Sequence, residues 1–235
     1  MIDLPAFYRR LQDHFSATLA DAPPAVAAEL QRLGVAPFAS DPALTLRPCP
    51  LLVVSMKPYG APGRTYPHGW EERKDHPGLH RWYDGGRATG NFVREADLLV
   101  RTMLAELAPD LPPRAVPNTY AYFYRAQDAK QLKSFGLDRI DCTAFHREIL
   151  TTVAPRVLLC VGNGPVPSAY ATYREMLAEE VITQSERVLA PAPRIKVKVF
   201  RAEKVLVIGV PHLSYVRAET VVPTVVDCLV EEGSS

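Results

Sequence analysis

Four consecutive aliphatic residues, Leu51 to Val54, constrain the fold of this chain most, because residues that cannot extend a strand follow them at once. An unbroken apolar run of this length is typical of a strand buried on both faces, as in a parallel sheet covered by helices. Pro58 and Gly60 then end the hydrogen-bonded ladder. Ligands of open α/β sheets bind beyond the carboxyl ends of the strands. This segment therefore predicts both a central strand and a candidate site.

Apolar strands and amphipathic helices alternate along the rest of the chain. The periodicity predicts helices over residues 3–20, 24–33, 91–108, 143–153, 166–180 and 218–231, and strands over 51–55, 116–124, 156–161, 195–200 and 204–210. The alternating run 195–200 is expected at a sheet edge, and residues 43–48 are a further candidate for edge pairing. We expect one domain over residues 1–235, a three-layer α/β/α fold with a central, mainly parallel four-stranded sheet plus an edge strand. The helices within about residues 1–35 cover it.

Composition excludes several classes of protein. Twenty-seven basic and 26 acidic residues give a net charge of +1, so the chain has no basic excess that would grip nucleic acid by charge alone. The four cysteines are far apart and form no Cys-x-x-Cys pair, which argues against a zinc knuckle or a compact iron–sulfur site. No signal peptide and no apolar run near about 18 residues is present. We expect a cytoplasmic monomer without a cofactor or a membrane partner.

A long polar segment, residues 56–90, follows the first strand and is rich in glycine, proline, histidine and aromatic residues. Segments of this length without regular structure are uncommon in compact domains and are often functional. His76 and His80 are four residues apart, but Pro77 and Gly78 between them disfavour the helix that such a metal-binding pair needs. We therefore expect no metal site.

Three polar residues stand at or near the ends of predicted strands: Lys57, Asn118 and His212. Each has an ordinary structural interpretation, as a solvated side chain, a turn cap or a histidine at a strand end. A glycine pair, Gly162 and Gly164, lies between a strand and a helix and can present backbone N–H groups to an anion. It lacks the third glycine of a dinucleotide-binding fingerprint.

The order of these segments resembles that of the uracil-DNA glycosylase superfamily. The segment 55–60, Ser-Met-Lys-Pro-Tyr-Gly, shares Pro-Tyr with the family motif Gly-Gln-Asp-Pro-Tyr-His and Met-x-Pro with the motif Gly-Met-Asn-Pro-Gly of another branch. Residues 117–119, Pro-Asn-Thr, are similar to the family's Leu-Asn-Thr strand. Residues 155–162 match a Pro-x-Val-x-Leu-x-x-Gly strand, and residues 212–214, His-Leu-Ser, a reduced form of His-Pro-Ser-Pro-Leu-Ser. The resemblance covers about residues 50–217.

This resemblance implies base excision from DNA, with a nucleotide flipped out of the helix. It implies that His212 stabilises the negative charge of the departing base and that Asn118 reads the edge of a pyrimidine. Leu213 is the candidate wedge that fills the emptied stack. The substrate-binding residues that the motifs indicate are Ser55, Met56, Pro58, Tyr59, Asn118, Leu213 and Ser214. The base-stacking candidates are Tyr59, Trp70, Trp82 and Tyr83.

Lys57 is the main departure from the family, which has Asp or Asn at this position to activate or position the attacking water. A protonated lysine cannot act as a general base unless burial lowers its pKa. Three outcomes stay open: a binder of bases with altered or lost activity, a carboxylate elsewhere as the base, or Lys57 as a nucleophile that forms a Schiff base. The carboxylate candidates are Glu71, Glu72, Asp75 and Asp84. Of the three, altered specificity or lost activity is favoured over the lysine nucleophile.

The sequence thus predicts a DNA glycosylase-like protein whose catalytic candidates are Lys57 and His212. The alternative is a catalytically inactive nucleic-acid or nucleotide binder on the same fold, and a third hypothesis is a small-molecule enzyme that binds phosphate at 162–164. Basic residues in the two loops are candidates for phosphate contacts. They are Arg64, Arg73, Lys74, Arg81, Arg87, Arg125, Lys130 and Lys133.

Overall fold

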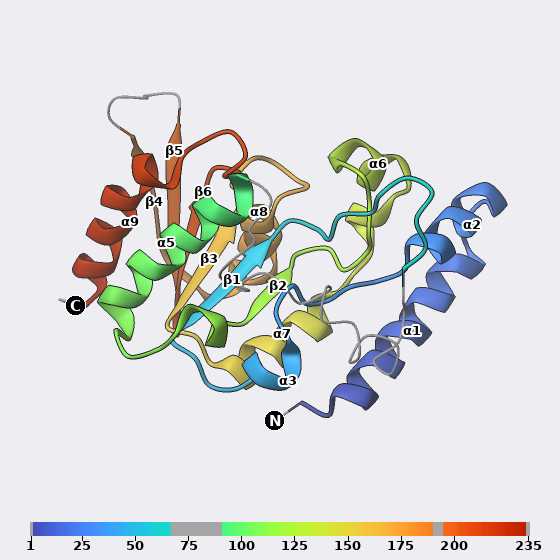
Figure 1. Cartoon of the computed structure of the whole chain (residues 1–235), viewed down its shortest axis with the longest axis horizontal. Helices are drawn as coiled ribbons and strands as arrows, with labels where there is room; N and C mark the ends of the chain where they lie inside the picture. The colour runs from blue at the N-terminus through green and yellow to red at the C-terminus, as the bar shows by residue number, and fades with distance from the viewer. Residues whose placement is uncertain (1, 67–90, 190–194, 234–235) are drawn as a thin grey trace.

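The computed structural model describes residues 2–66, 91–189 and 195–233 and has a mixed α/β fold (Figure 1). Within these residues the sheet has six strands in the order β2-β1-β3-β6-β5-β4. They are β1 (Leu51–Ser55), β2 (Asn118–Tyr120), β3 (Val157–Val161), β4 (Val181–Val188), β5 (Lys196–Ala202) and β6 (Val205–Val210). The first three and β6 are parallel, whereas β5 is antiparallel to both β4 and β6. The sheet is therefore larger than the predicted four strands with one edge strand.

Helices connect and cover these strands (Figure 1). They are α1 (Leu4–Ala20), α2 (Pro24–Leu33), α3 (Pro42–Thr45), α5 (Asn91–Leu107), α6 (Ala129–Ser134), α7 (Thr143–Val153), α8 (Ala169–Met176) and α9 (Ala218–Gly233). Single 3₁₀ turns are η3 (Pro113–Ala115), η4 (Leu137–Arg139) and η5 (Ala178–Glu180). Local signals set their starts: the Asp3 side chain accepts a hydrogen bond from the Ala6 backbone N–H, as expected of a helix cap. None of the described helices has the length and apolar character needed to span a membrane.

Two hydrophobic clusters lie on opposite faces of the sheet. Leu52 and Val54 of β1 belong to the cluster shared with α1, α7 and α8, whereas Leu51 and Val53 belong to the cluster shared with α5 and α9. Alternate residues of a strand point to opposite faces, so both faces of β1 are buried, as its unbroken apolar sequence predicts. Burying each such side chain contributes on the order of 1.5–3 kcal/mol. Packing on both faces therefore fixes the position of the central parallel strands, and the loops that follow them start from these fixed ends.

Three sequence predictions differ from the structure. Residues 43–48 do not pair at an edge, because Asp41 and Pro42 begin the short helix α3 instead. The predicted strand 116–124 is reduced to the three residues of β2, since the chain then leaves the sheet. β5 is not an edge strand: β4 covers its outer side.

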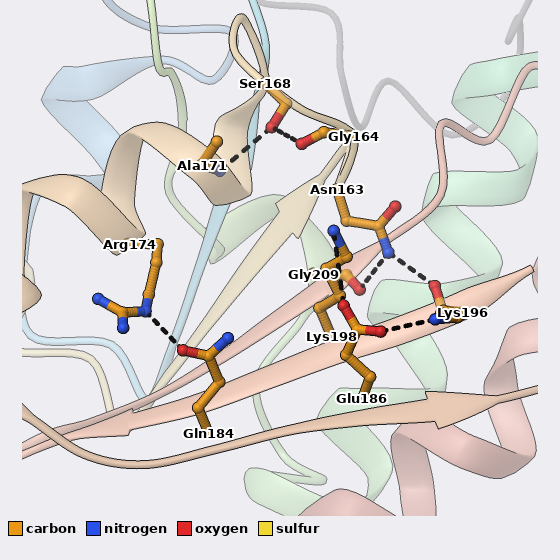
Figure 2. Close-up of polar contacts among 10 residues, drawn as sticks. All are labelled: Asn163, Gly164, Ser168, Ala171, Arg174, Gln184, Glu186, Lys196, Lys198 and Gly209. Carbon is orange, nitrogen blue, oxygen red and sulfur yellow. Dashed lines mark hydrogen bonds and ion pairs between the residues drawn. The ribbon is translucent and has the colours of Figure 1, made fainter.

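The edge strand β4 is held mainly by its ladder with β5, and polar side chains add to it (Figure 2). Arg174 of α8 donates to Gln184 at 2.9 Å, and Lys196 donates to Glu186 at 2.8 Å. The first is a hydrogen bond to a neutral amide and the second an exposed ion pair, and solvent weakens both. The backbone ladder therefore defines the position of β4, which extends the sheet away from the parallel half.

Candidate functional site

A cleft of about 940 Å³ lies at the carboxyl ends of the parallel strands. Segments that follow β1, β3 and β6 form it, together with Tyr120 at the end of β2. The amino-terminal ends of α5 and α6 contribute further side chains. The residues that line it include Ser55, Met56, Lys57, Tyr59, Phe92, Tyr120, Asp128, Asn163, His212, Ser214 and Tyr215. Because parallel strands end at one edge, segments from distant parts of the chain meet here.

Lys57 lies in this cleft with its ammonium partly withdrawn from water. Its Nζ donates to the backbone carbonyl of Ala126 and lies 5.9 Å from the centroid of the Tyr59 ring. Burial lowers the pKa of Lys57 to about 8, against the opposing effect of the Asp128 charge, while Arg125 lowers it further. With that pKa, about a tenth of the lysine side chains are neutral at pH 7.

His212 faces the same cleft from the end of β6. Its ring stacks on Phe92, with centroids 4.9 Å apart and an angle of 29° between the planes. The Ser214 backbone N–H donates to Nδ1 at 3.3 Å, so the neutral ring carries its proton on Nε2. Burial, followed by the charge of Lys57, lowers the pKa of His212. The imidazole is therefore neutral at pH 7 and has one N–H donor left for a ligand.

Asp128 is a carboxylate in the cleft that sequence reasoning missed. It begins α6, and its side chain accepts from the Gln131 backbone N–H at 2.7 Å. The Gln131 side chain in turn accepts from the Gln127 N–H at 2.6 Å. This reciprocal pattern is a variant of the capping box, and the spacing Asp-x-x-Gln is the signal that could have located the helix. The charge of Asp128 acts on Lys57, which puts an acid and an amine at the same cleft.

The loop after β3 is fixed by side-chain hydrogen bonds (Figure 2). The amide of Asn163 donates to the backbone carbonyls of Lys196 at 2.7 Å and Gly209 at 2.9 Å. Ser168 caps α8: its hydroxyl accepts from the Ala171 N–H at 3.1 Å and donates to the Gly164 carbonyl at 2.7 Å. Gly162, with φ of 112°, permits the turn out of β3. This wall of the cleft is therefore tied to β5, β6 and α8.

The structure brings together most of the residues that the motifs indicate. Ser55, Met56, Lys57, Tyr59, His212 and Ser214 all line the cleft. Pro58 is buried beside it and does not line it. Residues from the first and last motifs, more than 150 positions apart in the sequence, thus share one site.

Asn118 lies below the cleft and does not line it. It pairs with Val53, whereas Tyr120, the partner of Ser55, reaches the cleft. Its side chain is fully buried, and neither amide atom has a hydrogen-bond partner among the described residues. A buried amide without a partner costs about 1–3 kcal/mol. Asn118, which the resemblance implies reads the edge of a base, therefore does not contact the cleft in this structure.

Leu213 does not project from the loop after β6. It is 2% exposed and packs in the cluster with α5 and α9, so its assignment as the wedge is not supported by its position. Tyr215, two residues further on, is 88% exposed and lines the cleft. An aliphatic residue next to a strand end is drawn into the core, which leaves the following tyrosine as the side chain that extends outwards.

Arg125 also differs from its expected role in contacting phosphate. Its side chain donates to the Tyr59 carbonyl at 2.8 Å and stacks on Tyr66 at 4.2 Å, and the residue is 7% exposed. It therefore stabilises the loop after β1. Lys130 and Lys133 are exposed on α6, the helix whose amino-terminal end lines the cleft. Arg64 is exposed, and its guanidinium carbon lies 5.3 Å from the centroid of the Tyr66 ring. The remaining predicted stacking, basic, metal-binding and carboxylate candidates lie outside the described residues: Trp70, Glu71, Glu72, Arg73, Lys74, Asp75, His76, His80, Arg81, Trp82, Tyr83, Asp84 and Arg87.

The described residues contain no cluster of three or more histidine, cysteine, aspartate or glutamate side chains that could hold a metal ion. The fold and site define an α/β protein with an amine, an imidazole, a carboxylate and several aromatic rings at the carboxyl ends of its parallel strands. Comparison with protein-family models and with curated proteins gives no match to this chain.

Proposed function

We propose that this protein binds DNA, holds an extruded, damaged or deaminated base in the cleft, and acts as a divergent member of the uracil-DNA glycosylase superfamily. The observation that carries the proposal is that Lys57 and Tyr59, from the first motif, and His212, from the last, line the same cleft. The carboxyl ends of the parallel strands β1 and β6 lie at the same edge of the sheet, which brings these two distant segments together. The order of the motifs along the chain supports the same assignment.

Aromatic side chains around the cleft suit a planar base. Tyr59 and Tyr215 are 58% and 88% exposed, and Phe92 and Tyr120 also reach the cleft. Stacking on one aromatic side chain stabilises a bound base by about 1–3 kcal/mol. The cleft volume of about 940 Å³ is within the range of small-molecule sites and leaves room for a base with its sugar.

The chemistry proposed for the site is hydrolysis of the N-glycosidic bond. When this bond breaks, negative charge develops on the departing base, and the neutral Nε2–H of His212 is a donor for it. Lys57 is mostly protonated at pH 7 and cannot take a proton from water. Among the described residues that line the cleft, Asp128 is the carboxylate that can.

The test is excision from single- and double-stranded oligonucleotides that contain uracil, hypoxanthine or xanthine, at enzyme excess. We expect alkali-labile sites from at least one of these bases and none from an undamaged control strand. Alkali-labile sites from none of the three bases, or an equal yield from the control strand, would contradict excision of these bases.

A catalytically inactive binder on the same fold is the second candidate, favoured by a lysine where the family has a water-activating residue. It predicts salt-dependent binding of these oligonucleotides without any excised base. The absence of both binding and excision would overturn both candidates. Saturable nucleotide binding unaffected by changes at Lys57 and His212 would instead favour a small-molecule enzyme.

A further inference from the structure

The surroundings of the Lys57 amine differ from those of a lysine that serves only as a charge. Its Nζ donates to a neutral backbone carbonyl, that of Ala126. Asp128 acts on it through space. The amine lies in an open cleft beside the aromatic ring of Tyr59, so a ligand can reach it.

We propose that Lys57 is a nucleophile that captures an aldehyde as a Schiff base, and that the aldehyde is the ring-opened C1′ of an abasic site in DNA. The assignment of DNA as the carrier of the aldehyde rests on the proposed function. The capture of an aldehyde by the amine does not.

Nucleophilic attack needs the neutral amine, and the groups around Lys57 provide it. Burial favours the neutral form and brings the pKa to about 8. The charged groups that face it are Asp128, whose negative charge opposes this effect, and Arg125, whose positive charge adds to it. His212 is neutral at pH 7 and therefore adds no charge beside Lys57.

The reaction balances without a further reagent. The lone pair of the neutral Nζ forms a bond to the aldehyde carbon while the carbonyl π electrons move to the oxygen. A proton then passes from the nitrogen to that oxygen to give a neutral carbinolamine. Breakage of the carbon–oxygen bond, with a second proton added to the hydroxyl, releases water and leaves a protonated imine. One amine, one aldehyde and one proton thus give one protonated imine and one water molecule.

Groups that can move these protons lie in the same cleft. The neutral His212 has its Nε2–H as a donor, and the Asp128 carboxylate is an acceptor. The Lys57 charge lowers the pKa of His212, which shows that the two groups are close enough to interact.

The experiment is reductive trapping with cyanoborohydride, which converts an imine to a stable secondary amine. The full chain is incubated with an oligonucleotide in which an abasic site has been made beforehand, with the intact oligonucleotide, and with glyceraldehyde. We expect a covalent protein–DNA adduct only with the abasic strand, and a modified Lys57 in peptide mass spectra. The trapping rate is expected to level off above about pH 8, whereas an ordinary lysine would gain about tenfold per pH unit up to its pKa.

Two variants define the result. Lys57→Arg keeps the positive charge but cannot form the imine, and its adduct yield is expected to fall more than tenfold. Lys204→Arg makes the same change at an exposed lysine in the turn before β6, at the opposite edge of the sheet from the cleft, and is expected to stay within twofold of the wild type. An undiminished yield in Lys57→Arg, or adducts spread over other lysines, would overturn the proposal.

The outcomes separate this inference from the proposed function. Because the abasic site is made beforehand, trapping does not depend on base excision. Trapping without excision supports the amine chemistry and counts against hydrolysis, whereas excision without trapping overturns the nucleophile alone. Adducts with glyceraldehyde at Lys57 but none with abasic DNA would overturn DNA as the carrier of the aldehyde.

Discussion

The variant His212→Ala is expected to lower the rate of base excision by a factor of about 10²–10³, the loss typical of removing one donor from an oxyanion site. The neutral ring has its Nδ1 occupied by the Ser214 N–H, so its remaining donor serves the ligand. Its stacking on Phe92 fixes the plane of the ring. We expect the loss in the single-turnover rate with a saturating oligonucleotide, because the charge on the departing base develops only as the bond breaks.

His14→Ala is the matched control, since it removes a partly buried histidine of α1, outside the cleft. Its excision rate is expected to stay within twofold of the wild type. Comparison of urea unfolding curves separates a loss of chemistry from a loss of folded protein. If His212→Ala excised the base as fast as the control, the role of His212 in base excision would be contradicted.

The variant Gly209→Ala is expected to destabilise the protein by about 1–3 kcal/mol, the cost of overpacking a core. A Cβ at this position of β6 would overlap the ring of Tyr170, with Cγ at 2.7 Å, and would lie 3.1 Å from Cβ of Asn163. Tyr170 packs in the core from α8 and cannot swing away. The same shift would disturb the hydrogen bond from Asn163 to the Gly209 carbonyl. The free energy of unfolding in urea measures the effect.

Gly164→Ala is the control for this variant. A Cβ there meets no atom within 4 Å, so its free energy of unfolding is expected to stay within about 0.5 kcal/mol of the wild type. If Gly209→Ala were as stable as Gly164→Ala, the close packing of α8 on β6 would be contradicted.

Elements with strong periodicity were predictable from the sequence. β3, β6 and the first four residues of β1 are apolar because both faces of these strands are buried, and α1, α5 and α7 carry a clear apolar stripe. β4 was missed because it is exposed along most of its length and has no regular alternation of apolar and polar residues. Propensity alone could not distinguish this polar edge strand from the end of the preceding helix.

The candidate site was predictable only where its residues directly follow a strand. Lys57 and His212 do so, which is why the sequence located them. Asp128 and Phe92 come from the first residues of helices, and only the packing of α6 and α5 against the sheet edge brings them to the cleft. For Asn118 the motif located the strand. It did not show that the side chain lies below the cleft, because the register between β2 and β1 sets that position. Leu213 packs in the core and Tyr215 is exposed. The sequence alone did not show which of these two nearby side chains would be buried.

The measurement that tests the account most directly is an NMR titration of the ¹⁵N-labelled protein with a short single-stranded oligonucleotide that contains uracil or hypoxanthine. If the cleft binds an extruded base, the amide signals of Lys57, Tyr59, Asn163 and His212 will shift together and saturate at one concentration. They will shift less with an oligonucleotide that lacks the altered base. Shifts confined to other surfaces, such as β4 or α7, with these four signals unchanged at saturation, would contradict the assignment of the cleft.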